Sequence, residues 1–289
     1  MATSTAWSIR GAAGEAIPGD THMPGSKASG VVLIAHGFKG YKDYGFIPRL
    51  AAMVASAGFV VHRFNFSHSG MTSETATFAR PDLFERDTWN KQLFDLRKVI
   101  EAVGSGRIAG KELPLILLGH SRGGVTAILT AGRLASDASF LQPAGVIAVA
   151  SPASCQPFAR EDVELLLRQG YLESPSARTG QRLRIGRAFI QEQLDDPMSH
   201  DLTKLIGAIQ CPILLVHGDA DDAVPCRCAF KLALASRGNA EVALVPGGNH
   251  VFNCPNPMPG AHPVGGPLLM LIGEVVRFAQ RATNPSRAR

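Results

Sequence analysis

Runs of consecutive apolar residues alternate along this chain with segments in which apolar residues recur every three or four positions. Continuous apolar runs occupy residues 31–35, 113–118, 146–150 and 212–216, and helical spacing fills residues 47–57. A continuous run of this length is typical of a strand buried on both faces, and helical spacing is typical of an amphipathic helix. The alternation predicts βαβ crossovers, and therefore a mostly parallel central sheet with helices on both faces.

Two parts of the chain depart from this rhythm. Residues 1–30 are small and polar, with several glycines and prolines, and suggest short antiparallel strands around 7–10 and 15–22. From 153 to 210 no strand pattern is evident, and the segments there look amphipathic or irregularly helical. We therefore expect a single α/β domain over residues 1–289, with a small helical cap inserted at 153–210.

Composition limits the classes of partner. Of the 289 residues, 45% are hydrophobic and 18% are charged, so most of the chain can fold around a sizeable core. The formal charge of +5 is a mild excess of Lys and Arg, without the basic blocks and aromatic platforms of nucleic-acid binders. We expect no nucleic-acid partner.

The cysteines and the N-terminal residues bear on the compartment. Five scattered cysteines do not suggest a disulfide framework, which fits a reducing cytoplasm. The N-terminus lacks the basic segment and apolar core of a signal peptide, and no apolar stretch is long enough to span a bilayer. The sequence predicts a cytoplasmic protein without a membrane partner.

A Gly-x-Ser-x-Gly pattern, with Ser121 at its centre, lies where an apolar strand pattern passes into a helical one. Gly119 and Gly123 flank the serine because a strand that reverses so tightly into a helix leaves no room for side chains. The free N–H groups at the start of the following helix would face charge that develops beside the serine oxygen. Ser121 is therefore the candidate nucleophile.

In this strand–turn–helix context the motif resembles the nucleophile elbow of the α/β-hydrolase superfamily. The resemblance covers nearly all of residues 31–281 and implies the α/β-hydrolase fold, with a triad in the chain order serine, acid, histidine. The segment 36–43 (HGFKGYKD) and the modest insertion before Cys211 look like the cytoplasmic acyl-esterase and cinnamoyl-esterase-like branch.

The acid is expected in the loop 217–225, which follows a predicted strand and contains three aspartates. The family pattern Gly-x-x-Asp-x-x-Val-Pro falls on Asp221, with Asp219 bracing the turn and Asp222 pointing to solvent. A turn that only caps the next helix is the other interpretation of this loop.

The base is expected in the glycine-rich loop 246–252, past the last strand pattern. His250 lies there and matches the base of the family. His262, in the Pro/Gly-rich segment behind it, is an alternative. His217 is interpreted as structural, with its ring set against the acid loop.

The resemblance also implies an oxyanion hole made of two main-chain N–H groups. Arg122, the residue after the nucleophile, supplies one of them, and Phe38 matches the other. Gly37 beside it permits close approach of the backbone to a substrate.

These residues together lead us to expect a serine hydrolase that cleaves carboxylic esters through an acyl-enzyme, with no metal or organic cofactor and a small-molecule ester as its partner. Peptidases and thioesterases use the same triad, and some proteins of this fold only bind ligands. The acyl and alcohol preferences and the oligomeric state stay open at this point.

Three further patterns give weaker indications of function. Cys226 and Cys228 have too few partners nearby for a zinc site. Residues 67–70 are interpreted either as a loop at the mouth of the site or as an ordinary turn. Four arginines of the cap form either a solvated face or a surface that attracts anionic substrates; they are Arg178, Arg182, Arg184 and Arg187.

Overall fold

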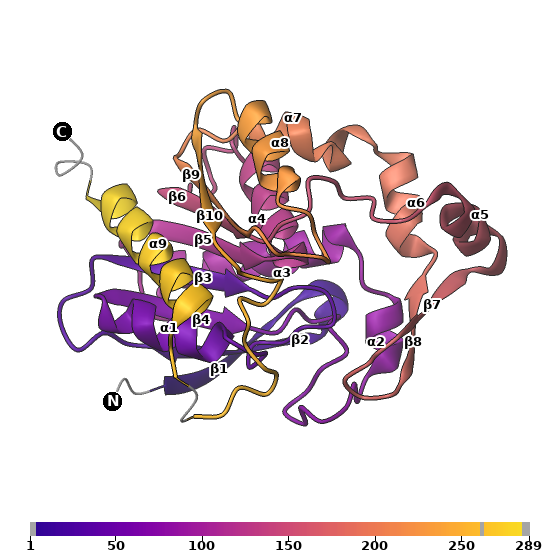
Figure 1. The fold of residues 1–289 in the computed structure, drawn as a ribbon, viewed down its shortest axis with the longest axis horizontal. Coiled ribbons are helices and arrows are strands. Elements are labelled where there is room, and N and C mark those ends of the chain that lie inside the picture. The colour runs from indigo at the N-terminus through magenta and orange to yellow at the C-terminus, as the bar shows by residue number, and fades with distance from the viewer. Residues whose placement is uncertain (1–3, 261–262, 285–289) are drawn as a thin grey trace.

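A single eight-stranded sheet forms the centre of the molecule (Figure 1). The computed structural model describes residues 4–260 and 263–284. The strand order is β1-β2-β4-β3-β5-β6-β9-β10, in which β1 and β2 form an antiparallel hairpin and the six strands from β4 to β10 in that order are parallel. The strands are β1 Ser4–Arg10, β2 Ala16–His22, β3 Gly30–Ala35, β4 Phe59–Phe64, β5 Leu115–His120, β6 Gly145–Val149, β9 Ile213–Gly218 and β10 Ala240–Val245.

Helices cover both faces of this sheet. Helices α1 and α9 pack on one face, while α3, α4, α7 and α8 pack on the other. The helices are α1 Ile47–Ser56, α2 Pro81–Glu85, α3 Trp89–Gly104, α4 Arg122–Arg133, α5 Arg160–Gln169, α6 Ala188–Asp195, α7 Leu202–Ile206, α8 Arg227–Ala235 and α9 Gly266–Thr283, with 3-10 turns η1 Ala12–Gly14 and η2 Met198–His200.

Burial along the central strands explains why their apolar runs are continuous. In β3, Val31, Leu33 and Ala35 pack into one core cluster, whereas Val32 and Ile34 pack into the cluster on the opposite face. Because successive side chains of a strand point to opposite faces, a strand covered on both sides needs an apolar residue at every position. The predicted mostly parallel sheet with helices on both faces is confirmed.

The segment 153–210 contains a strand pair that the sequence analysis did not predict. Strands β7 (Tyr171–Pro175) and β8 (Arg182–Gly186) form a separate antiparallel hairpin. The prediction of a purely helical cap was therefore wrong for this part. The strands are only five residues long and carry few inward apolar side chains, although Arg182-Leu183-Arg184-Ile185 does alternate between exposed and buried residues. That alternation was the signal that could have revealed the hairpin.

The hairpin and helices α5 and α6 lie together at one side of the molecule, next to α2 (Figure 1). A small apolar cluster, separate from the two main cores, holds these elements together; it consists of Leu166, Leu172 and Ile190. Helix α7, at the end of the same segment, packs instead against α4 and α8 in the main core. Within the described residues no helix is both long enough and apolar enough to cross a membrane.

Candidate active site

Ser121 lies at the sharp turn between the end of β5 and the first turn of α4. Its backbone has φ 53° and ψ −120°, and its N–H donates to the carbonyl oxygen of Val149 at 2.7 Å. A Cβ atom at Gly119 would lie 2.0 Å from the carbonyl oxygen of Gly123, and one at Gly123 would lie 2.3 Å from that of Ala35. Only glycine therefore fits at the two positions that flank the serine.

His250 lies in the loop after β10 and contacts Ser121 directly. Its Nε2 is 3.0 Å from Oγ of Ser121, and its Nδ1 is 2.8 Å from Oδ2 of Asp221, which follows β9. The three loops meet because β5, β9 and β10 are parallel strands whose carboxyl ends share one edge of the sheet. The structure thus brings together the three side chains predicted as nucleophile, base and acid.

The three aspartates of the loop after β9 take different positions. Asp221 is buried, and its Oδ1 accepts two main-chain N–H bonds, at 2.8 and 2.9 Å, from the next turn of its own loop. Asp219 accepts the N–H of Gly247 at 2.7 Å and so braces the acid loop against the loop of His250. Asp222 is exposed. Each aspartate lies where the motif predicted it.

The surroundings of Asp221 favour its ionised form. Burial raises the pKa of this carboxyl, but hydrogen bonds from His217, His250 and the N–H of Val224 outweigh burial and hold the pKa well below its usual range. His217 lies against the acid loop as predicted, with Nε2 2.8 Å from the carbonyl oxygen of Val224. An ionised carboxylate beside Nδ1 can fix the tautomer of His250 and stabilise its imidazolium.

His120 is a site residue that the sequence analysis missed. Its Nε2 donates to the main-chain carbonyl of His250 at 2.8 Å, and its ring packs against that of Phe46. Burial, helped by the nearby charge of His250, lowers the pKa of His120 to about 3, so the ring is neutral near pH 7. Its place within the motif, immediately before Ser121, was the one available signal.

Phe38 and Arg122, whose main-chain N–H groups were predicted as oxyanion donors, line the same cavity as Ser121. In the described part of the chain neither of these N–H groups donates to a protein acceptor. A Cβ atom at Gly37 would be 3.0 Å from Cβ of Ser121, which shows how closely the loop after β3 approaches the elbow. His36 holds this loop, because its Nδ1 donates to the carbonyl oxygen of Gly37 at 2.9 Å.

Two cavities open beside Ser121. The larger, of about 200 Å³, has mainly apolar and aromatic walls, and the smaller, of about 50 Å³, borders His250. The larger cavity is lined by Phe38, Trp89, Ser121, Arg122, Pro152, Ser154, Cys155, Pro157, Phe158, Ile185 and Phe189. The smaller is lined by Gly37, Phe38, Gly40, Tyr44, His120, Ser121, His250 and Val251.

The four arginines of the cap do not line either cavity. Arg178 lies over the rings of Tyr41 and Phe78, and Arg184 lies over the ring of Tyr171. The side chain of Arg182 is 81% exposed. These arginines are solvated or pack against aromatic rings, and none of the four borders either cavity.

The remaining candidates lie away from the two cavities. Ser67 and its neighbours form a buried turn, in which the N–H of Ser67 donates to Asp95, and they do not border either cavity; of the two interpretations, the ordinary turn is the one observed. Cys226 and Cys228 are half-buried, and the described residues contain no group of three or more potential metal ligands. His262 lies outside the described residues.

Comparison with known proteins places this geometry in context. A sequence model of the alpha/beta hydrolase family matches residues 31–261. Est1E from Butyrivibrio proteoclasticus, in a structure with ferulic acid bound, is similar with a TM-score of 0.68 and 17% identity over 93% of this chain and 96% of that chain. No curated protein matches the sequence significantly.

Two further solved structures share the fold at similar distance. The esterase domain of a Rhodothermus marinus protein has a TM-score of 0.64 and 18% identity, covering 96% of this chain and 98% of its own. Alpha/beta hydrolase domain-containing protein 10 from mouse has a TM-score of 0.64 and 18% identity, covering 96% of this chain and 99% of its own.

The neutral ring of His120 predicts a loss of stability in mild acid. Its pKa is about 3 in the folded protein and about 6.5 in an unfolded chain, so only the unfolded state takes up a proton as the pH falls through 6.5. Between pH 6.5 and 5 this one group should cost up to about 2 kcal/mol of unfolding free energy. His120→Gln keeps a donor for the carbonyl of His250 and should show a shallower decline in urea unfolding over this range. Parallel curves for the variant and the wild type would contradict the assignment of a neutral ring.

Proposed function

The chain belongs to the alpha/beta hydrolase family, and from this premise we propose that it is a serine hydrolase that cleaves carboxylic esters. The observation that carries the proposal is the continuous line of contacts from Oγ of Ser121 through the ring of His250 to Oδ2 of Asp221. A hydroxyl in reach of an oriented imidazole is the arrangement that activates a serine.

The first half of the reaction forms an acyl-enzyme. His250 Nε2 takes the proton of the Ser121 hydroxyl while Oγ attacks the ester carbonyl, and Asp221 stabilises the resulting imidazolium. The tetrahedral intermediate collapses when the bond to the alcohol oxygen breaks and Nε2 gives that oxygen its proton. The alcohol leaves, and the acyl group stays on Ser121.

Water completes the cycle through the same groups. His250 takes a proton from a water molecule, whose oxygen attacks the acyl-enzyme, and then returns the proton to Oγ of Ser121 as the acid leaves. In both halves of the reaction the oxyanion would accept hydrogen bonds from the main-chain N–H groups of Phe38 and Arg122. The loss of one such donor typically costs 10²- to 10³-fold in rate.

The two cavities divide the substrate between them. The proton that reaches the leaving oxygen comes from His250, so the alcohol must lie on the side of the smaller cavity, which His250 borders. The larger cavity borders Ser121 but not His250 and therefore takes the acyl group; we call it the acyl cavity. Its volume of about 200 Å³ exceeds that of an apolar cavity of about 150 Å³ that binds benzene.

The walls of the acyl cavity favour an aromatic or otherwise bulky apolar acyl group. Phe38, Trp89, Phe158 and Phe189 supply four rings around it. Ferulic acid is bound to Est1E, a protein of the same fold, and this supports an aromatic acid as the acyl part of the substrate. A peptidase or thioesterase would use the same triad, so an aminopeptidase substrate belongs in every activity screen as a counter-test.

A fluorophosphonate label tests the nucleophile. The wild-type protein should be labelled at one residue, Ser121, and should hydrolyse an activated aryl ester; Ser121→Ala should lose the label and at least about 10³-fold in kcat/KM. Mass spectrometry locates the label, and a spectrophotometric assay follows hydrolysis. Wild-type rates in Ser121→Ala would refute the nucleophile, and an unlabelled, inactive wild type would favour a protein that only binds ligands.

A matched pair of variants tests the acid. Asp221→Asn removes the charge that orients His250 and should lower kcat by about 10⁴-fold. Asp219→Asn keeps an oxygen acceptor for the N–H of Gly247 and should stay within about tenfold of the wild type. Both rates come from the same aryl-ester assay on folded protein. If only Asp219→Asn is crippled, the acid has been assigned to the wrong aspartate.

A further inference from the structure

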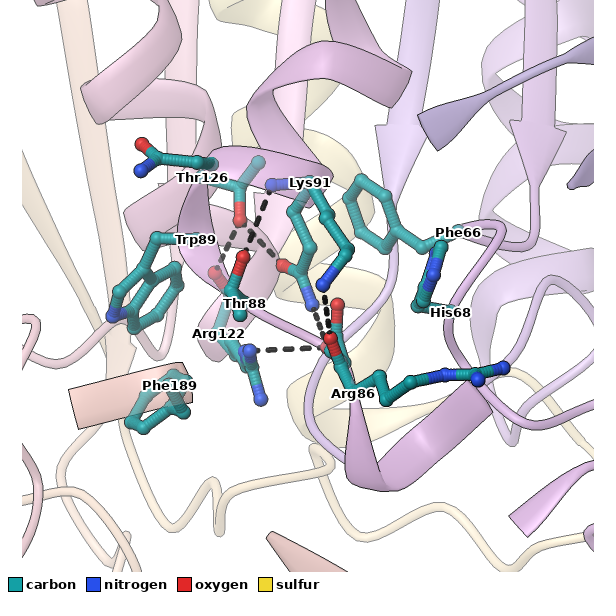
Figure 2. Close-up of polar contacts among 12 residues, drawn as sticks. Phe66, His68, Arg86, Thr88, Trp89, Lys91, Arg122, Thr126 and Phe189 are labelled. Carbon is teal, nitrogen blue, oxygen red and sulfur yellow. Dashed lines mark hydrogen bonds and ion pairs between the residues drawn. The ribbon is translucent and has the colours of Figure 1, made fainter. Parts of the chain in front are cut away.

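The side chain of Arg122 is buried at the wall of the acyl cavity, apart from the oxyanion role proposed for its main chain. Only 8% of the residue is exposed, and it is one of the residues that line this cavity. Its guanidinium lies 4.7 Å from the ring centroids of both Trp89 and Phe189, which Figure 2 shows beside it, and 5.6 Å from that of Phe38. Rings from three separate segments of the chain therefore surround one cation.

A buried carboxyl group of the protein already pairs with this guanidinium, although burial raises the pKa of that carboxyl, that of Asp87, against the opposing charge of Arg122. Nη2 of Arg122 is 3.0 Å from Oδ2 of Asp87. Gln92 donates to the same oxygen at 2.7 Å and accepts a hydrogen bond from the hydroxyl of Thr126 at 2.8 Å, so a chain of contacts between α3 and α4 fixes Asp87. Glu192, on α6, adds a second negative charge to the surroundings of Arg122. A substrate anion would therefore gain little from this arginine.

The hydrogen-bonding capacity of the guanidinium, in contrast, is largely unused. A guanidinium has five N–H donors. Nε and Nη2 are buried without a hydrogen bond of good geometry. The contact of Nη2 with Asp87 is an ion pair and does not meet the angular requirement of a hydrogen bond. Buried donors of this kind are costly unless a partner arrives.

Apart from Arg122, the lining of the acyl cavity contains no charged side chain that would attract or repel a hydrogen-bond acceptor of the substrate. Arg122 is the one ionised side chain among its lining residues in the described part of the chain. The Cys155 thiol also borders it, and burial raises the pKa of that thiol to about 12, which keeps it neutral. The cavity thus combines apolar walls with one cationic hydrogen-bond donor. The carboxyl that pairs with this donor, that of Asp87, is not among the residues that line the cavity.

We propose that Arg122 is a specificity-determining residue whose guanidinium donates a hydrogen bond to an uncharged oxygen of the acyl group. The substrate would then be an ester of a largely apolar, aromatic acid that carries an ether or hydroxyl oxygen. This inference rests on the proposed function for the identity of the bond that is cleaved. The recognition step itself involves no bond cleavage and can be measured as binding alone.

The test compares esters that differ only in the acceptor oxygen. Ethyl esters of 3-arylpropanoic acids carry on the ring, at each position in turn, a methoxy group, an ethyl group of the same shape, or a carboxylate. Dissociation constants are measured by calorimetry on protein with Ser121→Ala, and kcat/KM is measured on protein with an intact Ser121. At one ring position the methoxy ester should be preferred to the ethyl ester by about tenfold in both measurements.

Variants then assign the preference to the guanidinium. Arg122→Met keeps the main-chain N–H and should bring the methoxy-to-ethyl ratio to about one, whatever happens to the absolute rate. Arg182→Met, the same substitution at an exposed position of the cap, should leave the ratio unchanged. If Arg122→Met leaves Asp87 unpaired and does not fold, the double variant Arg122→Met with Asp87→Asn removes both charges and should give the same ratio near one.

The outcomes separate this inference from the proposed function. A wild-type ratio near one at every ring position, or a ratio that survives in folded Arg122→Met, overturns the role of Arg122. Arg122-dependent preference for the carboxylate ester also overturns it, because the site would then bind an anion. If the protein binds the methoxy ester more tightly than the ethyl ester but hydrolyses neither, the result supports recognition by Arg122 and refutes the proposed esterase function.

Discussion

The reversal of the chain between β5 and α4 is the constraint on which the rest of the site depends. Ser121 has a positive φ of 53°, a conformation that costs a non-glycine residue on the order of 1–3 kcal/mol. Its N–H bond to Val149 and the backbone contacts that Gly119 and Gly123 permit hold it in place. This turn aims the hydroxyl at His250, starts α4 directly after the serine, and directs the side chain of Arg122 to the wall of the acyl cavity.

Buried histidines position each of the loops that meet this turn. His36, His120 and His217 each place a ring nitrogen 2.8 to 2.9 Å from a main-chain carbonyl, in the loops that contain Gly37, His250 and Val224 respectively. Burial lowers the pKa of His36 to about 4 and that of His120 to about 3, so these two rings act as neutral donors. A rigid arrangement of this kind costs little reorganisation when charge develops during a reaction. The same burial makes the fold sensitive to acid.

Much of this arrangement could be predicted because it follows from local chemistry. Central strands covered on both faces show as continuous apolar runs, and parallel strands bring the residues that follow them to one edge, which placed Asp221 and His250 near Ser121. The hairpin of β7 and β8 was not predicted because both strands are short and β8 contains two arginines. The pairing of Arg122 with Asp87 could not be read from spacing, since the packing of α3 against α4 joins residues that lie on different elements. His120 was hidden because the contact it makes is to a main-chain atom of a distant loop.

The central claim is that the hydroxyl of Ser121 becomes covalently acylated during turnover. The most direct measurement is the mass of the protein and of its proteolytic peptides after acid quenching within the first turnover of an aryl ester of 3-phenylpropanoic acid. The account predicts a mass increase equal to one acyl group, located on the peptide that contains Ser121. Turnover of the ester with no such adduct, or with the acyl group on a different residue, would contradict it.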